Sequence, residues 1–199
     1  MNASETEMRR TELALTRNVL DFWFGEEGSE TYATNRPQWF RKDADFDNEI
    51  RHKFADDVET ALGGGHMRMA ENQMSCLALI IMLDQFPRNL FRDTALAFAG
   101  DKRALSLANE AVRLGFDRNL PKPLQMFFYL PFEHSESLDD QLRCMDLFKA
   151  SGNEDMLKWA AAHHDIIARF GRFPHRNEAL GRESTQEEID FLKEPDSSF

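Results

Sequence analysis

Apolar residues recur at every fourth position over one stretch of the chain, and this spacing constrains the fold more than any other feature. The stripe consists of Phe46, Ile50, Phe54, Val58 and Leu62, and three glycines follow it. Residues four apart share one face of an α-helix, and glycine commonly ends helices. Leu and Ala number 41 whereas Val and Ile number 9, which disfavours strands. We therefore predict an all-α protein.

Start and stop signals divide the rest of the chain into further helices. The nearly continuous apolar run from Gln73 to Phe86 predicts a buried helix that ends at Pro87. Because the connections are short, we expect antiparallel helical hairpins in a superhelix or bundle. Capping residues, glycines and prolines predict the other helices at about 101–114, 124–130, 138–151, 154–170 and from Thr185 onwards.

Length and composition indicate a compact protein that needs no disulfide bonds for its stability. A chain of 199 residues buries roughly 70% of its unfolded surface. We predict one domain over residues 1–199, with flexible tails at 1–10 and 194–199. Cys76 and Cys144 lack metal-binding spacing and are expected to be buried thiols in a reducing compartment. No signal peptide is visible and the longest apolar run is far below the ~18 residues that cross a membrane, so we expect a cytoplasmic protein with no membrane partner.

The charge distribution narrows the range of partners. The 24 Lys and Arg against 35 Asp and Glu give a net charge of −11. This acidity repels phosphates, so we expect no nucleic-acid partner. The excess lies in the flanks, because residues 61–182 contain 15 basic and 15 acidic side chains. The balanced middle of the chain is compatible with a small anionic ligand.

The first polar motif stands at the end of the apolar run. Asp84 follows the hydrophobic residues at 76–83 by one position, where both desolvation and the negative end of a helix disfavour a carboxylate. Asp84 therefore needs cations or donors nearby, and Arg88 is four residues away. Gln85 and Asn89 complete the motif. The alternative is that Asp84 and Arg88 form an ion pair with a purely structural role. Structural ion pairs shift pKa values as active sites do, so a shifted pKa does not distinguish the two interpretations.

The second polar motif places a histidine between two acids. His134 lies between Glu133 and Glu136, and neighbouring carboxylates are expected to raise its pKa. A protonated imidazole near neutral pH is suited to general acid catalysis. The alternative is that Ser135 or Glu136 caps the next helix and that His134 is a satisfied polar group.

The third motif is the densest in polar side chains and spans His164–Asn177. On a helix, His163 shares an apolar stripe with Ile167, so we predict that it is a core histidine. The remaining side chains form a donor-rich patch suited to a carboxylate or phosphate. The patch consists of His164, Asp165, Arg169, Arg172, His175, Arg176 and Asn177.

The sequence lacks the usual motifs of metal sites, serine nucleophiles and phosphate-binding loops. The histidines and acids show neither HExxH nor HxH spacing, so we expect no metal. No GxSxG motif marks a serine nucleophile, and the three glycines at 63–65 lack the Lys and Ser or Thr of a phosphate loop. We expect no cofactor.

The polar motifs also carry a family resemblance. The stretches Val19–Gly25, Leu83–Arg92, Tyr129–Glu136 and His164–Asn177 resemble the bacterial family catalogued as domain of unknown function 924. The likeness runs from about Val19 to Phe191, with departures at Gly100, Lys102 and the loop 63–72. The resemblance implies an all-helical fold similar to tetratricopeptide superhelices. It implies no reaction, substrate or catalytic set.

Three functional hypotheses follow from these motifs. The first is a helical binding protein whose pocket takes a small anion or an acidic peptide end. The second is an acid–base hydrolase in which His134 or His164 acts with Glu133 or Asp165. The third is a buried polar network without a ligand, on a protein-interaction scaffold. The predicted ligand-binding residues are Asp84, Gln85, Arg88, Asn89, Glu133, His134, Glu136, His164, Asp165, Arg169, Arg172, His175, Arg176 and Asn177.

Overall fold

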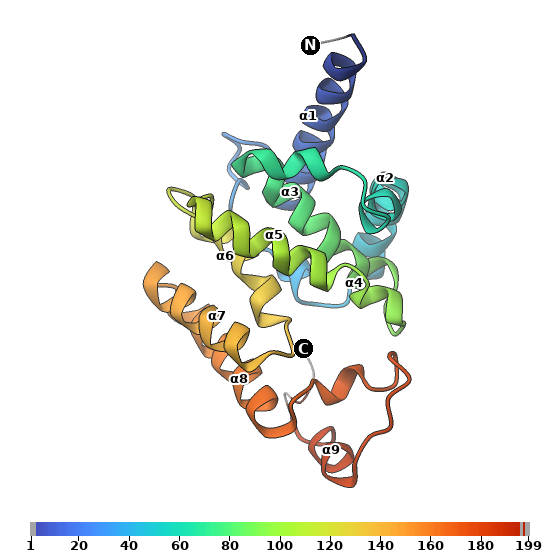
Figure 1. Ribbon diagram of the computed structural model, residues 1–199, viewed down its shortest axis with the longest axis vertical. Coiled ribbons are helices and arrows are strands. Elements are labelled where there is room, and N and C mark those ends of the chain that lie inside the picture. Colours follow the sequence, from blue (N-terminus) through green and yellow to red (C-terminus); the bar gives the residue numbers. More distant parts are fainter. Residues whose placement is uncertain (1–2, 196, 198–199) are drawn as a thin grey trace.

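The computed structural model describes residues 3–195 and 197, and these residues form helices joined by loops and turns. The all-α prediction is confirmed (Figure 1). The α-helices are α1 (Ala3–Phe24), α2 (Ala44–Leu62), α3 (Gln73–Asp84), α4 (Phe86–Leu90), α5 (Asp101–Leu114), α6 (Lys122–Glu133), α7 (Leu138–Ser151), α8 (Glu154–Phe170) and α9 (Gln186–Phe191). Short 3-10 turns are η1 (Pro37–Trp39), η2 (Met67–Glu71), η3 (Ala95–Phe98) and η4 (Pro174–Arg176).

Local capping chemistry sets several of these helix ends. Gly115, Gly152 and Gly171 close α5, α7 and α8 with positive φ angles of 76°, 66° and 68°, a conformation that glycine adopts without a steric penalty. The Thr185 hydroxyl accepts a hydrogen bond from the Glu188 backbone N–H, and the Glu188 carboxylate accepts one from the Thr185 backbone N–H. This capping box confirms the helix start predicted at Thr185.

Two prolines have roles beyond those predicted, although α3 does end before Pro87. Pro87 lies in the first turn of α4, where the missing N–H costs nothing, so it begins a new helix after α3. Pro131 lies inside α6, which continues to Glu133 instead of ending at 130. The extra turn places Glu133 on a helix and His134 directly after it.

Helix α3 is the centre of the main hydrophobic core. All its residues from Ser75 to Asp84 are buried, and α1, α2, α5 and α6 pack around it. Aromatic rings join the loop after α1 to this core, because Trp23 packs against Trp39, Phe86 and Phe127 at centroid distances of 5.5–6.0 Å. This packing holds the loop after α1 against α4 and α6.

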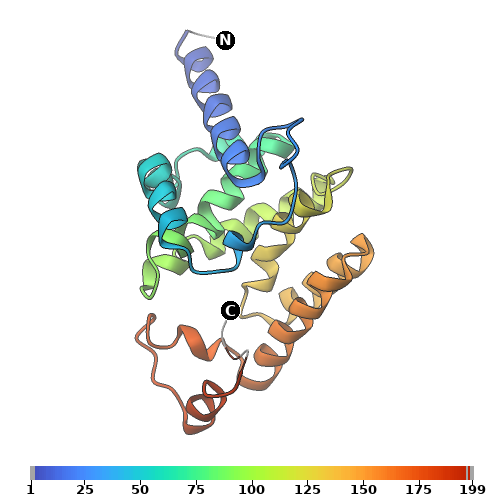
Figure 2. The ribbon, with the colours of Figure 1, turned by 180° about the vertical axis from the view of Figure 1, so that it is seen from behind.

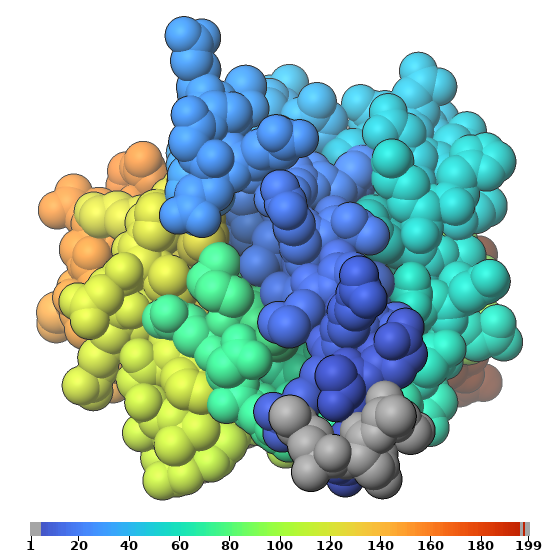
Figure 3. Space-filling model, turned by 90° about the horizontal axis from the view of Figure 1, so that it is seen from above, coloured from blue at the N-terminus to red at the C-terminus, as the bar shows by residue number. Residues whose placement is uncertain are grey.

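Helix α1 is the largest element that the sequence did not predict. Its buried side chains, from Leu15 to Phe24, all belong to its second half. From above, α1 lies along the outside of the molecule between α2 and the start of α3 (Figure 3). The polar first half therefore lacked the core-facing stripe on which helix prediction depends.

The C-terminal segment, residues 171–195, has its own small apolar cluster. After α8 the chain turns back below α4 and α5 and ends with α9 close to α8 (Figures 1 and 2). Ile166, Ile167 and Phe173 form a core separate from the main one, and Phe170 and Phe191 pack against it.

Helices α7 and α8 pack closely as a hairpin. The tetratricopeptide-like arrangement stays a prediction.

The structure describes only part of the two tails predicted at residues 1–10 and 194–199. Residues 3–10, assigned to a flexible tail, form the first turns of α1. Residues 1, 2, 196, 198 and 199 lie outside the described residues, so the mobility of both tails stays a prediction. Among the described helices, none has the length and apolar character needed to span a membrane.

Candidate functional site

Side chains from five helices and η4 meet at the boundary between the main core and the C-terminal segment. The ends of α3 and α6 supply acids and a histidine, and α4, α5, α8 and η4 supply the rest. We call this group the central polar cluster. It consists of Asp84, Arg88, Asp101, Glu133, His134, His163, His175 and Arg176, which are linked by hydrogen bonds, ion pairs and electrostatic interactions.

A close backbone approach brings Asp101 into the cluster. A Cβ atom at Gly100 would lie 2.0 Å from the carbonyl oxygen of Leu83, a distance that no side chain tolerates. Glycine therefore lets the start of α5 abut the end of α3. As a result, Asp101 and Arg88 form a two-pronged ion pair with N–O distances of 2.8 and 3.0 Å.

Asp84 and His134 form the most buried pair of the cluster. Nδ1 of His134 lies 2.7 Å from Oδ1 of Asp84, whose side chain is 1% exposed. Gln85 donates to Oδ2 of Asp84 at 2.5 Å, and Arg88 donates to the Asp84 backbone oxygen. Burial alone raises the pKa of Asp84, but the charges of His134 and Arg88 and the hydrogen bonds outweigh it and lower the pKa to about 2.

The pKa of His134 shifts opposite to the sequence prediction. Burial and the charge of Arg88 lower it below its usual range, against the opposing effect of Asp84. The expected increase from both neighbouring acids fails because Glu136 points to Arg182 and Glu133 stays protonated, as described below. A neutral His134 donates from Nδ1 to Asp84, which leaves Nε2 as an acceptor. The His134 side chain is 15% exposed.

Glu133 lies deeper than His134, with the charged Asp84 and the buried His163 nearby. Burial, followed by the charge of Asp84, raises the pKa of Glu133 to about 8. Its Oε1 lies 3.6 Å from Nδ1 of His163, and burial lowers the pKa of His163 to about 3. The prediction that His163 is a core histidine is confirmed, because the residue is 5% exposed. Cys76 and Cys144 are buried thiols, as predicted.

Arg176 is the most buried cation of the cluster. The residue is 6% exposed, and its Nη1 donates to Oδ2 of Asp101 at 3.2 Å. Its guanidinium carbon lies over the rings of Phe98 and Phe173, 4.7 and 4.5 Å from their centroids. Burial and the charge of Arg88 lower the pKa of Arg176 to about 10. Its Nε is buried without a hydrogen-bond partner.

Three predicted site residues belong instead to a second group, which we call the C-terminal clamp: Glu136, Arg172, Asn177, Arg182 and Glu188. Glu136 accepts hydrogen bonds from the Phe173 backbone at 2.9 Å and from Arg182 at 2.8 and 3.0 Å. Asn177 accepts from Arg182 at 2.9 Å. Arg172 binds Glu188 at 2.6 and 2.8 Å. The clamp fastens the C-terminal segment to the end of α6.

Four other predicted residues have partners away from the central polar cluster. His164 contacts Asp165 at 3.1 Å, and the Asp165 side chain is 81% exposed. Arg169 binds Glu187 at 2.9 Å on the surface. Asn89 donates to Asp47 at 2.8 Å. The structure therefore gathers Asp84, Gln85, Arg88, Glu133, His134, His175 and Arg176 from the predicted set.

Asp101 and Phe98 are the residues of this region that sequence reasoning did not assign to a site. Asp101 was expected only to begin a helix, yet it binds both Arg88 and Arg176. The signal that precedes it is Gly100, one of the departures from the family pattern noted above. A glycine next to a helix start can mark a close backbone contact.

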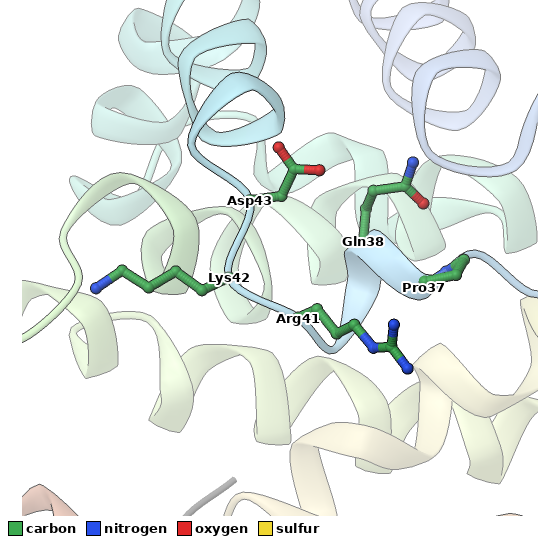
Figure 4. A pocket seen from close by; sticks show the side chains of 5 residues that line it. All are labelled: Pro37, Gln38, Arg41, Lys42 and Asp43. Carbon is green, nitrogen blue, oxygen red and sulfur yellow. The ribbon is translucent and has the colours of Figure 1, made fainter.

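The cavity found in the structure and the central polar cluster lie in different places. A cavity of about 320 Å³ lies in the loop before α2, lined by Pro37, Gln38, Arg41, Lys42 and Asp43 (Figure 4). The central polar cluster lies elsewhere. Its outer edge is partly open, because the side chains of Arg88 and Asp101 are 20% and 18% exposed. In the part of the chain described, no group of three or more His, Cys, Asp and Glu residues could hold a metal ion.

Comparisons with known proteins place the chain in a family. A family model described as "Bacterial protein of unknown function" matches residues 19–196. A solved structure, the Protein of Unknown Function ATU0120 from Agrobacterium tumefaciens, is 42% identical, with a TM-score of 0.81 over 91% of this chain and 98% of that chain. No curated protein matches the chain. The chain belongs to the bacterial family known as domain of unknown function 924.

Proposed function

We propose that the central polar cluster binds a small anion next to Arg176 and Arg88. The observation that carries the proposal is the state of Arg176, a guanidinium that is 6% exposed and has one hydrogen bond, to Asp101. A buried charge is costly unless it is paired and fully hydrogen-bonded. An anion at the unsatisfied side of Arg176 supplies the missing partner.

The balance of charges around Arg176 supports the same conclusion. Asp101 is shared between Arg176 and Arg88, while Asp84 accepts from His134 and Gln85. Glu133 contributes no charge near neutral pH because its pKa is about 8. At Arg88, burial is outweighed by the charges of Asp101 and Asp84, which raise the pKa. At Arg176, burial, followed by the charge of Arg88, outweighs the attraction of the nearby acids and lowers the pKa. Arg176 is therefore the less compensated of the two guanidiniums.

Thermal unfolding in matched salts tests the proposal. The protein is heated in sodium acetate, benzoate, phosphate or sulfate, with sodium chloride at equal ionic strength as the reference. Binding to the folded state raises the melting temperature in at least one salt, because a ligand at 100 times its Kd stabilises by about 2.7 kcal/mol. Arg176→Gln abolishes the increase, whereas Arg113→Gln, at a surface pair with Glu110, retains it.

Each outcome of this experiment has a defined meaning. An increase that Arg176→Gln removes supports the proposal. Equal melting temperatures in every salt contradict it and favour the interpretation of the cluster as a purely structural network. An increase that persists in Arg176→Gln places the anion elsewhere and also contradicts the proposal.

The Asp84–His134 pair favours a second candidate function, an acid–base hydrolase. A buried carboxylate that holds Nδ1–H of a histidine orients Nε2 as a general base, which is the relationship seen in catalytic triads. The partner of His134 is Asp84 at 2.7 Å, rather than Glu133. In this function, Nε2 of His134 takes a proton from a water that attacks an acyl carbon, and the leaving group is then protonated.

Hydrolysis of p-nitrophenyl acetate tests the second candidate. His134→Gln and Asp84→Asn are expected to lower the rate to the background level, while His52→Gln, on the exposed face of α2, leaves it unchanged. Equal rates for all four proteins contradict the candidate.

A further inference from the structure

The hydrogen-bonding edges of the guanidinium groups indicate which anion the cluster takes. A guanidinium is planar, and its Nε and one terminal nitrogen form an edge with two parallel N–H donors. This edge matches the two oxygens of a carboxylate. The hydrogen-bond partners of Nε and Nη2 differ among the arginines of this protein.

Three other arginines use Nε and Nη2 together to bind a carboxylate. Arg92 binds Asp47 at 2.6 and 2.8 Å. Arg172 binds Glu188 at 2.6 and 2.8 Å. Arg113 binds Glu110 through the same two nitrogens. Two-pronged binding of a carboxylate by this edge thus recurs in the chain.

Arg176 presents the same edge without such a partner. Its hydrogen bond to Asp101 uses Nη1, on the other side of the group. Its Nε is buried and unpartnered, and within the described residues Nη2 makes no hydrogen bond either. The side chain is 7% exposed, and Nε is the buried member of the two donors.

The aromatic surroundings of Arg176 restrict the shape of a ligand. The rings of Phe98 and Phe173 lie 4.7 and 4.5 Å from its guanidinium carbon and present aromatic carbon to the group. A ligand that keeps both ring contacts binds at the free edge formed by Nε and Nη2. A carboxylate is planar and fits this approach. Phosphate and sulfate are tetrahedral and would direct oxygens out of the plane, toward aromatic carbon.

We infer that the anion is a carboxylate, bound side-on by Nε and Nη2 of Arg176. The inference rests on the proposed anion-binding function and names its ligand class. Side-on binding accounts for the two unused donors at once and leaves the bond to Asp101 intact.

Calorimetric titration of the full chain tests the inference. Acetate, benzoate, phosphate and sulfate are each titrated at equal ionic strength. Wild-type protein is expected to bind benzoate and acetate at least tenfold more tightly than phosphate or sulfate. Arg176→Lys keeps the charge but lacks the edge, so carboxylate binding falls at least tenfold. Arg113→Lys, at the surface pair, binds as the wild type does.

The possible failures are distinguishable from one another. If phosphate or sulfate binds as tightly as the carboxylates, or if Arg176→Lys binds benzoate normally, the carboxylate inference is wrong while anion binding stands. If no anion binds, the proposed function and the inference are both wrong. The comparison among anions uses the wild-type protein alone, so it gives a result even if Arg176→Lys fails to fold.

Discussion

Nδ1 of His134 lies 2.7 Å from Oδ1 of Asp84, although 50 positions separate the two residues. The contact joins the end of α3 to the end of α6, the two helices at the centre of the core. Asp84 is 1% exposed and also accepts from Gln85. The pair therefore links the packing of the core to the polar chemistry of the site.

Asp84→Asn is expected to lower the free energy of unfolding by about 3–5 kcal/mol, because it removes a buried charge next to Arg88 and His134. Urea unfolding followed by circular dichroism measures the change. The control is Asp155→Asn, whose side chain is 91% exposed next to Lys158 and whose effect should stay within about 0.5 kcal/mol. Equal losses in the two variants would show that burial of the pair does not matter.

The pKa values of buried acids and histidines predict a stability maximum near pH 6.5. His163 and His175 have folded pKa values of about 3 and 4, lowered mainly by burial from 6.5. Below pH 6.5 the unfolded chain takes up these protons first, so stability falls as the pH decreases. Glu133 has a folded pKa of about 8, raised from 4.5. Between these two values the unfolded chain releases its proton first, so stability falls as the pH increases.

Glu133→Gln isolates the contribution of this acid. Urea midpoints are measured from pH 5 to 8.5, and the difference in unfolding free energy between variant and wild type is plotted against pH. The variant is expected to lose the decline between pH 6.5 and 8, because glutamine does not titrate. Glu183→Gln, at an exposed position, serves as the control. A difference that is constant across the pH range contradicts the raised pKa of Glu133.

Gly100→Ala is predicted to be far more harmful than the same change at Gly63. At Gly100 a Cβ would collide with the Leu83 oxygen at 2.0 Å, whereas at Gly63 its nearest contacts are at 3.4 Å. Forcing the helices apart costs about 1–3 kcal/mol or more. Both variants are compared by thermal unfolding. If Gly100→Ala is as stable as Gly63→Ala, the close approach of α3 and α5 is not needed for the fold.

Arg182→Ala is predicted to loosen the C-terminal segment without unfolding the main core. Arg182 binds Glu136, Asn177 and the Phe173 backbone oxygen. Hydrogen exchange followed by mass spectrometry should show faster exchange over 172–191 and unchanged exchange in α3. Arg17→Ala, at an exposed pair with Asp21, is the control. Uniformly faster exchange in both regions would mean that the segment and the core unfold together.

Local rules made much of the fold predictable from sequence. The stripe from Phe46 to Leu62 predicted α2, because residues four apart share a helix face. Gly115, Gly152 and Gly171 predicted helix ends, because each adopts a positive φ. The helix end before Pro87 was predicted and α3 ends at Asp84, but the start of α4 was not predicted, because the sequence around a proline does not show whether a new helix begins there.

The site was only partly predictable, because its key contacts are long-range. Arg88 lies one turn from Asp84, so their proximity follows from helix geometry. The bond between Asp101 and Arg176 spans 75 positions and depends on where the C-terminal segment packs. Because of the same packing, Glu136 binds Arg182 and Arg172 binds Glu188, both in the C-terminal clamp. Three motifs rich in polar residues were visible, but which members would meet depended on tertiary structure.

The separate apolar cluster of the C-terminal segment has a thermodynamic consequence. Arg176 and His175 lie on this segment, whereas Asp84, Arg88 and His134 lie on helices of the main core or at their ends. A fluctuation that detaches the segment therefore dismantles the cluster while most of the core stays folded. Any molecule that needs both parts must then favour the attached state, and its affinity includes the free energy of that local equilibrium.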